Sequence, residues 1–255
     1  MNRILTLTVL TLIGISLLSA GCQVTQGIQG KTTFTDTIRI GTMKDPLSVD
    51  ISFVKGPTHN HPTFAIWIED LSGNYLQTLY VTRSLATGFY YRGSLGAEMW
   101  DNQPGPQQRP ATLPYWLHKR SESLKVPLLP DSNNPLLDGY TGATPVGDFI
   151  MQAGLPVNIP SSFRIMLEIN QPWDWNDYWT NNLYDDPDYH TSCQPSLIYA
   201  VTVDTTQPTI EYFLNPIGHG HYSGVNGQLY TDLSTLTTAK EIIGKASVKL
   251  IKSGR

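Results

Sequence analysis

Apolar and polar residues alternate along much of the chain with the two-residue period of half-buried β-strands. The alternating segments are residues 33–40, 48–54, 63–69, 75–81, 147–151, 162–169, 197–203 and 246–251. Segments 63–69 and 75–81 flank Asp70-Leu71-Ser72-Gly73-Asn74, whose glycine suits a tight turn, so we predict a hairpin there. Eight or more short strands separated by turn residues predict a mainly β fold, an antiparallel immunoglobulin-like β-sandwich.

Two regions depart from this strand pattern. Residues 84–145 contain many prolines and glycines and no long periodic run, which predicts a long irregular insertion over the sheet surface, with one short strand or helix near residues 115–118. Leu236, Ala239, Ile242 and Ile243 recur at helical spacing, and Thr238 and Glu241 are placed like a capping box. We therefore predict one short helix near the C-terminus.

The first 22 residues have the pattern of a bacterial export signal. A positive charge at Arg3 is followed by an apolar stretch over residues 4–18 and then by small residues. Leu18-Ser19-Ala20-Gly21-Cys22 looks like the lipobox of bacterial lipoproteins, in which the cysteine is lipidated. We predict a signal peptide at 1–21 and lipidation of Cys22. The alternative is ordinary signal-peptidase cleavage at the small residues, which leaves a free thiol.

The remaining chain divides into a tether and a domain. Residues 22–31 are rich in Gln, Gly and Thr and predict a short tether, and residues 32–255 predict a single β-sandwich domain. Several acyl chains on one cysteine anchor a protein firmly, because each buried methylene contributes about 0.8 kcal/mol. The predicted location is the bacterial cell envelope, with the membrane as partner through the lipid and an envelope protein or a glycan as a further partner. Gln23 at the second mature position favours the outer membrane.

Charge and cysteine content narrow the functional classes. Charged residues make up 15% of the chain and the formal net charge is −4, so the chain lacks the basic surface of a nucleic-acid-binding protein. The sequence contains two cysteines. If Cys22 carries lipid, no intramolecular disulfide can form, and Cys193 is predicted to be buried as a small apolar residue.

Two His-x-His pairs form the first candidate site, which would bind a metal ion. His59, His61, His219 and His221 are four of the six histidines. Residues two apart point to the same side of an extended segment, so each pair can offer two imidazoles to one ion. Together the pairs predict a Zn or Cu site with three or four nitrogen ligands. The alternative is that each pair makes turn and surface hydrogen bonds in a Gly/Pro-rich loop.

An aromatic cluster directly after the strand at 162–169 is the second candidate. Trp173, Asp174, Trp175, Asn176 and Trp179 interleave indole rings with carboxylate and amide groups. Flat rings stack on sugar faces while Asp and Asn bind hydroxyls, which predicts a carbohydrate-binding or carbohydrate-acting site. The alternative, which we favour, is a hydrophobic cap on one end of the sandwich, with Asp and Asn bonding to turn backbone.

Catalytic motifs are incomplete in this sequence. It contains no Gly-x-Ser-x-Gly, His-Glu-x-x-His, Walker or Gly-x-Gly-x-x-Gly sequence. Cys193 and His190 suggest a nucleophile and base only by their proximity in sequence, and nothing selects two carboxylates for glycoside hydrolysis. The sequence therefore favours a protein without catalytic activity.

Three phrases of the chain resemble a known family. They are residues 64–70 with Gly73 and 78–80, residues 138–145, and Leu167-Glu168-Ile169-Asn170 followed by Trp173-Asp174-Trp175-Asn176. In this order they are similar to a family of bacterial periplasmic proteins known as domain of unknown function 2271. The resemblance covers most of residues 60–205 and implies an exported β-sandwich. It implies neither a reaction nor catalytic residues.

Three functions follow, in order of preference. The first is a lipid-anchored, non-catalytic binding or accessory module of the bacterial envelope. The second is a metal-binding envelope protein that holds Zn or Cu through the paired histidines. The third is a carbohydrate-binding or carbohydrate-acting protein that uses the indole rings of the aromatic cluster.

Overall fold

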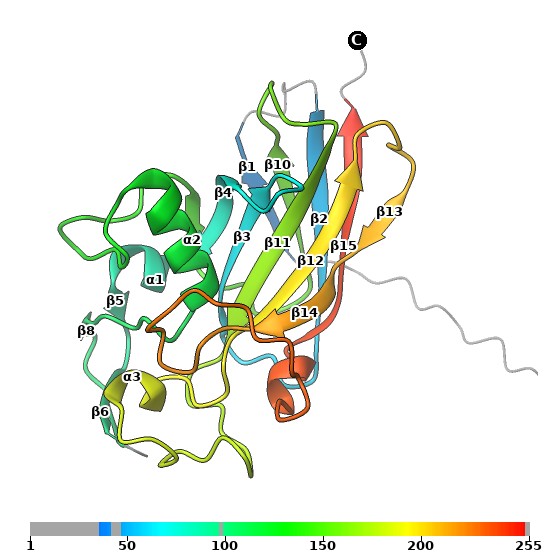
Figure 1. Cartoon of the computed structure of the whole chain (residues 1–255). Helices are drawn as coiled ribbons and strands as arrows, with labels where there is room; N and C mark the ends of the chain where they lie inside the picture. The colour runs from blue at the N-terminus through cyan, green and yellow to red at the C-terminus, as the bar shows by residue number, and fades with distance from the viewer. Residues whose placement is uncertain (1–35, 42–46, 97–98, 253–255) are drawn as a thin grey trace, which may run out of the picture. The chain divides into compact units, whose positions relative to one another are not determined.

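Most strands of the protein gather in two sheets, which are drawn in Figure 1. The structure is a computed structural model that describes residues 36–41, 47–96 and 99–252. These residues belong to one compact unit, which runs from Thr33 to Arg255. The predicted signal peptide, the lipidation site at Cys22 and the tether at 22–31 lie outside the described residues.

The first sheet has five strands in the order β1-β10-β2-β15-β13. They are β1 (Asp36–Ile40), β10 (Phe149–Gly154), β2 (Leu47–Lys55), β15 (Ile243–Lys252) and β13 (Glu211–Phe213). β1 pairs with β10 in parallel, and the other neighbours are antiparallel. β2 buries every second residue at Val49, Ile51 and Phe53, as its alternating sequence predicts.

The second sheet has six strands in the order β14-β12-β11-β3-β4-β9. They are β14 (Asn215–His219), β12 (Leu197–Asp204), β11 (Ser162–Asn170), β3 (Thr63–Glu69), β4 (Tyr75–Thr82) and β9 (Tyr140–Gly142). β3 and β4 form the predicted hairpin. In its turn the N–H of Gly73 donates to the carbonyl of Asp70 at 3.1 Å, and Gly73 has a φ of 85°, which a glycine adopts without strain.

The mainly β prediction is confirmed, whereas the antiparallel immunoglobulin-like arrangement is not. The parallel pairs β1–β10 and β4–β9 make both sheets mixed. Parallel neighbours need a long crossover connection. The chain between β1 and β10 and the insertion between β4 and β9 supply these connections, and the periodicity of single strands carries no information about them.

The two sheets share one hydrophobic core. The ring of Phe53 on β2 stacks on that of Phe149 on β10 with their centroids 4.5 Å apart, and it lies 6.2 Å from the ring of Phe64 on β3. Fully buried residues come from the first sheet (Val49, Ile51, Met151, Val248) and from the second (Ile66, Leu79, Phe163, Ile165). Each such side chain stabilises the fold by roughly 1.5–3 kcal/mol when buried, so this shared core holds the sheets together.

The insertion at residues 84–145 is packed against the other face of the six-stranded sheet. It includes most of α1 (Arg83–Thr87) and all of α2 (Pro114–Leu124), and α2 is the element predicted near residues 115–118. Trp67 on β3 is fully buried in a second hydrophobic cluster with Leu85 and Trp116. Because both faces of β3 are covered, all of its residues are buried.

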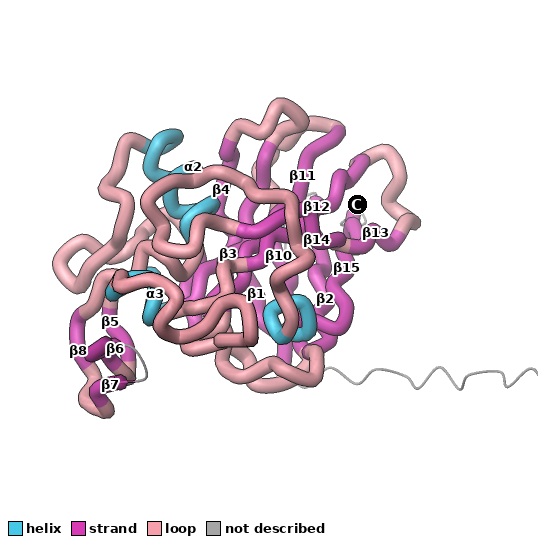
Figure 2. Tube along the Cα trace, turned by 60° about the horizontal axis from the view of Figure 1, so that its bottom comes forward, coloured by secondary structure: helices cyan, strands magenta, loops and turns pink. Residues whose placement is uncertain are grey.

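Two short ribbons complete the insertion. β5 (Phe89–Tyr90) pairs with β8 (Gly105–Pro106), and β6 (Gly93–Gly96) pairs with β7 (Met99–Asp101). Figure 2 shows the ribbons side by side, next to α3 (Pro187–His190), which contacts β6. The insertion therefore also meets the loops that follow β11.

Glu168 on β11 joins α2 to the sheet. Its Oε2 accepts a hydrogen bond from the N–H of Trp116 at 2.7 Å, and its Oε1 accepts from the N–H of Tyr115 and the hydroxyl of Ser196 at 3.2 Å and 2.5 Å. These backbone N–H groups lie at the start of α2, where a helix has no partners of its own for them. Complete burial raises the pKa of Glu168 to about 7, although the three hydrogen bonds act in the opposite direction.

The predicted C-terminal helix is a single 3-10 turn, η1 (Thr238–Glu241). The capping-box interpretation is wrong, because the residue before η1, Thr237, makes no side-chain cap. The hydroxyl of Thr238 donates instead to the carboxylate of Asp174 at 2.5 Å. The apolar spacing at Leu236, Ala239 and Ile242 places these side chains in the main core without a longer helix.

Candidate functional site

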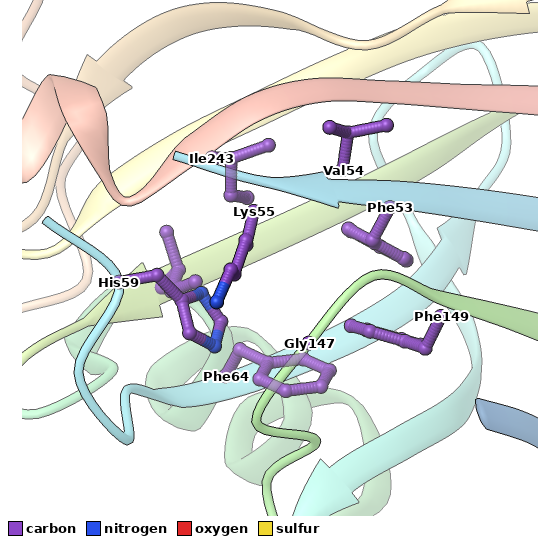
Figure 3. A pocket seen from close by; sticks show the side chains of 9 residues that line it. Phe53, Val54, Lys55, His59, Phe64, Gly147, Phe149 and Ile243 are labelled. Atoms are coloured by element: carbon purple, nitrogen blue, oxygen red, sulfur yellow. The ribbon is translucent and has the colours of Figure 1, made fainter. Parts of the chain in front are cut away.

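His59 lies in a narrow apolar crevice, seen in Figure 3, with Phe53 and Phe64 on its walls. Its Nδ1 and Nε2 lie 3.3 Å and 3.1 Å from the backbone oxygens of Ile242 and Pro145. The crevice has a volume of about 10 Å³, which accommodates roughly one water molecule. His59 thus holds the β2–β3 connection against two other segments.

The two His-x-His pairs are not brought together. His61 precedes β3 and His219 ends β14, and β11 and β12 lie between these strands. Three strand spacings of about 4.8 Å amount to roughly 14 Å. His61 has a φ of 51°, so residues 59–61 are not extended and the two imidazoles line different pockets. Within the described residues, no group of three or more His, Cys, Asp or Glu side chains is placed to hold a metal ion.

His219 and His221 pack against tyrosine rings instead. The ring of His219 stacks on Tyr230 with their centroids 5.3 Å apart, and the ring of His221 stacks on Tyr222 at 4.4 Å. Nδ1 of His221 accepts a hydrogen bond from the N–H of Ser223 at 3.1 Å. Burial lowers the pKa of both imidazoles, which keeps them neutral at pH 7.

Trp179 packs beside these rings. Together with Tyr184, Tyr222 and His219 it covers one end of the core, and this group is called the aromatic cap below. It is buried, its ring centroid is 6.4 Å from that of His219, and its Nε1 donates to the hydroxyl of Thr235 at 3.1 Å. Tyr184 and Tyr222 stack beside it with their centroids 4.0 Å apart. Tyr222 is distant from Trp179 in the sequence, and Tyr184 follows it outside the Trp-rich segment, so the sequence analysis included neither.

Asn176 and Asp174 bind loops of the protein to one another. Oδ1 of Asn176 accepts hydrogen bonds from the backbone N–H groups of Tyr178 and Trp179 at 2.9 Å and 2.7 Å. Its amide donates to three oxygens on other segments, namely Gln194 Oε1, Thr235 O and Thr237 Oγ1. Asp174 accepts from Thr238, while the ring of Trp175 is 46% exposed. Of the predicted aromatic cluster, Trp173 is the member that lines a pocket of ligand size.

That pocket has a volume of about 730 Å³ and is called the arginine pocket below. The residues that define it are His61, Arg83, Tyr90, Arg92, Arg109 and Trp173. They come from the ends of β3, β4 and β11 and from the insertion, so the pocket lies where the insertion covers one end of the six-stranded sheet. Its volume is within the range of roughly 300–1,000 Å³ that is usual for small-molecule sites.

Arg109 is the most unusual residue of the arginine pocket. Its side chain is only 4% exposed, and its guanidinium lies 3.9 Å from the ring centroid of Tyr90 and 5.6 Å from that of Trp173. Nε and Nη2 donate to Oε1 of Gln107 at 3.1 Å and 3.0 Å, and Nη2 also donates to the carbonyl of Arg92. Burial lowers the pKa of Arg109, although arginine keeps its charge at any physiological pH.

No carboxylate balances this charge in the part of the chain that is described. The ion pairs found there join Lys119 to Glu69, Arg120 to Asp138, and Lys245 and Lys249 to Glu211. No described Asp or Glu lines the arginine pocket, which holds three guanidinium groups. A buried charge without a counter-ion is costly, so the pocket is electrostatically suited to an anion.

Two lining residues have strained backbones. His61 and Trp173 have φ values of 51° and 54°, in the left-handed region that residues with side chains seldom adopt. The N–H of Trp173 donates to the carbonyl of Thr191 at 3.2 Å, and the N–H of Asn60 donates to Oε1 of Gln171 at 2.8 Å. Strain of this kind collects at binding sites, and here both strained side chains meet at one pocket.

Cys193 is buried, as predicted, and is not suited to nucleophilic chemistry. It is a free cysteine with no exposed surface, and burial raises its pKa to about 12. Nε2 of His190 lies 2.9 Å from the carbonyl of Tyr184. The thiol is therefore protonated at neutral pH, and a thiol rather than a thiolate is a poor nucleophile.

The three arginines of the pocket were missed in the sequence analysis. Arg92 follows Phe89-Tyr90-Tyr91, an aromatic run inside a Gly/Pro-rich segment, and this was the one local signal for a binding surface. Arg83 and Arg109 carry no such signal. Their importance depends on burial and on the lack of an acidic partner, which are properties of the folded chain.

No protein-family model, curated protein or solved structure matches the chain. The resemblance to domain of unknown function 2271 therefore stays a prediction. No helix in the described part of the chain combines the length and apolar character required to cross a membrane.

Proposed function

We propose that this protein is a lipid-anchored, non-catalytic binding module of the bacterial envelope and that its ligand occupies the arginine pocket. The observation that carries the proposal is Arg109, a buried guanidinium without an acidic partner that lines a pocket of about 730 Å³. Its described walls offer guanidinium, imidazole, hydroxyl and aromatic groups. These groups bind and orient a ligand, whereas the free thiol found in the described residues, that of Cys193, is buried elsewhere.

Filling the pocket should abolish ligand binding without unfolding the protein. Ala143 lines the arginine pocket and is exposed, so Ala143→Trp adds a bulky ring without a clash in the core. We expect one or more members of a panel of saccharides, peptides, amino acids and nucleotides to raise the melting temperature of the wild type by several degrees and to leave Ala143→Trp unchanged.

The matched control for this experiment is Val146→Trp. Val146 follows in the same loop, is 70% exposed and is not a lining residue. It should respond to the ligand as the wild type does. A panel in which no compound stabilises the wild type, or in which Ala143→Trp responds equally, would contradict the proposed binding site.

The anchor is tested separately through Cys22. In a bacterium that processes lipoproteins, the wild type should incorporate labelled palmitate and sediment with membranes, because acyl chains hold it there. Cys22→Ser should lose the label and appear in the soluble fraction. Cys193→Ser, which alters the other cysteine of the chain, should keep both properties. Equal labelling of wild type and Cys22→Ser would exclude this anchor.

A further inference from the structure

We infer that the ligand of the arginine pocket is an acidic saccharide, whose carboxylate or phosphate group pairs with Arg109. This inference rests on the proposed function and adds the chemical class of the ligand. It depends on three features of the pocket: the unpaired part of the Arg109 guanidinium, the sign of the charges around it, and the polar and aromatic side chains on its walls.

The guanidinium of Arg109 is held in place by hydrogen bonds that leave one of its amino groups, Nη1, without a partner in the described chain. Its bonds to Gln107 and to the carbonyl of Arg92 use Nε and Nη2. Within the described chain, Nη1 has no hydrogen-bond partner, although it carries two N–H donors. Tyr90 and Trp173 lie against the guanidinium and limit its movement. An anion that binds Nη1 therefore meets a pre-positioned donor and gives this buried charge the counter-ion it lacks.

The other charged side chains that line the pocket in the described chain have the same sign as Arg109. Arg83 and Arg92 line the pocket and are exposed, so they lie toward solvent. The chain as a whole carries a net charge of −4, which makes a pocket with three guanidinium groups and no described carboxylate a local exception. Such an arrangement attracts anions and excludes cations, and this is the reason why we prefer an acidic ligand to a neutral one.

The remaining walls suit a sugar ring. Hydroxyl and amide side chains line the pocket, and these are Asn60, Thr63, Thr82, Ser84, Thr87 and Thr144. The hydroxyls of Thr82, Thr87 and Thr144 donate to backbone carbonyls of the protein, so they offer a ligand an acceptor oxygen rather than a donor. Aromatic rings provide the second type of surface, since Phe89 and Tyr91 are 44% and 81% exposed. Hydroxyl partners together with exposed rings are the combination that polar, flat-faced saccharides require.

The test compares acidic saccharides with neutral partners of the same shape. The probes for calorimetric titration at low ionic strength are trigalacturonic acid and its trimethyl ester, glucose 6-phosphate and glucose, and inorganic phosphate. We expect one acidic saccharide to bind at least about tenfold more tightly than its neutral partner, since a charge-assisted bond to a buried arginine is lost in the partner. The trimer and the phosphorylated sugar distinguish a carboxylate from a phosphate ligand.

Two arginine variants and one aromatic variant locate the contacts. Arg109→Met should weaken binding of the acidic saccharide by about 30-fold or more. Arg83→Gln, at an exposed position, should weaken it by only a few fold, and less at high salt. Tyr91→Ala should weaken binding of the saccharide but not of inorganic phosphate. The matched control is Arg39→Gln, because Arg39 is an exposed arginine on β1, away from the pocket lining.

Each outcome has a definite consequence. Preference for the acidic saccharide with the expected order of variants supports the inference. If Arg109→Met does not fold, the same preference together with a few-fold weakening in Arg83→Gln that diminishes at high salt supports it. Equal binding of acid and ester, or phosphate binding as tightly as either sugar, overturns it. The proposed function stands in those cases, or when another member of the panel binds in a manner that Ala143→Trp blocks. The proposed binding site fails when Ala143→Trp blocks the binding of no member of the panel.

Discussion

A Glu168→Ala chain is expected to be less stable than the wild type by about 3–5 kcal/mol in its free energy of unfolding. The carboxylate accepts bonds from the N–H groups of Tyr115 and Trp116 and from the hydroxyl of Ser196, and it has no exposed surface. Each buried donor that loses its partner costs about 1–3 kcal/mol. Urea denaturation followed by tryptophan fluorescence measures the loss.

Glu168→Gln separates the charge of this side chain from its hydrogen bonds. The pKa of Glu168 is about 7 in the folded protein, above its ordinary value of 4.5. The folded state therefore holds a proton that the unfolded state releases. The resulting stabilisation is complete below about pH 4.5 and is lost as the pH rises through 7. Across this window the wild type should lose up to about 3 kcal/mol relative to Glu168→Gln, which carries no ionisable group there.

The comparison of the two chains isolates Glu168 from other titrating groups. His219 and His221 have lowered pKa values, so their contribution falls as the pH drops through 6.5, in the opposite direction. They are present in both chains, and their effect cancels in the difference. Parallel stability curves for wild type and Glu168→Gln between pH 5 and pH 8 would show that this carboxyl group does not titrate in the expected range.

Asn176→Ala is expected to cost about 2–4 kcal/mol and to loosen the loops beside the aromatic cap. The side chain makes hydrogen bonds to the backbone of Tyr178 and Trp179 and to oxygens of Gln194, Thr235 and Thr237. A typical hydrogen bond contributes about 1 kcal/mol net, and the alanine removes all of these bonds at once. The measurements are the denaturation midpoint and hydrogen exchange of residues 176–180 and 235–238.

Two further variants make this prediction specific. Asn176→Asp keeps the oxygen that accepts from the N–H groups of residues 178 and 179 but cannot donate. A large loss of stability in this variant would therefore assign the stabilisation to the hydrogen bonds that Asn176 donates to other segments. Asp177→Ala changes the exposed neighbouring residue and should leave stability within about 0.5 kcal/mol of the wild type. Equal stability of Asn176→Ala and Asp177→Ala would show that this network contributes nothing.

Elements with a local signal were the ones that could be predicted from the sequence. The hairpin of β3 and β4 was predicted because alternation and a turn glycine occur within one short stretch, and a short strand or helix was predicted at residues 115–118, where α2 lies. The helix predicted around Thr238 is a short 3-10 turn, since the side chain of Thr238 bonds to Asp174, which is distant in the sequence. A local capping pattern carried no information about that competing partner.

The candidate site, too, has residues that the sequence identified and residues that it did not. Indole rings and imidazoles were identified as candidates by residue type and spacing, and two of them, Trp173 and His61, line the arginine pocket. Among the described residues the four histidines do not form the predicted metal site, whereas Trp179 follows the favoured interpretation of a hydrophobic cap. His59 fills a crevice, and Trp179 is buried in the aromatic cap. Residues two or three apart diverge here because the backbone is not extended at His61 and Trp173.

The sequence alone determined that this is a mainly β chain, which strand positions place their side chains in its core, and which residues have the pattern of a lipoprotein signal. Each of these properties depends on the order of neighbouring side chains. The arginine pocket depends on the approach of segments distant in sequence, since the insertion must fold over the end of the six-stranded sheet before Arg109 loses contact with water. A surface arginine needs no partner, whereas a buried one does, and that difference arises only when the chain has folded.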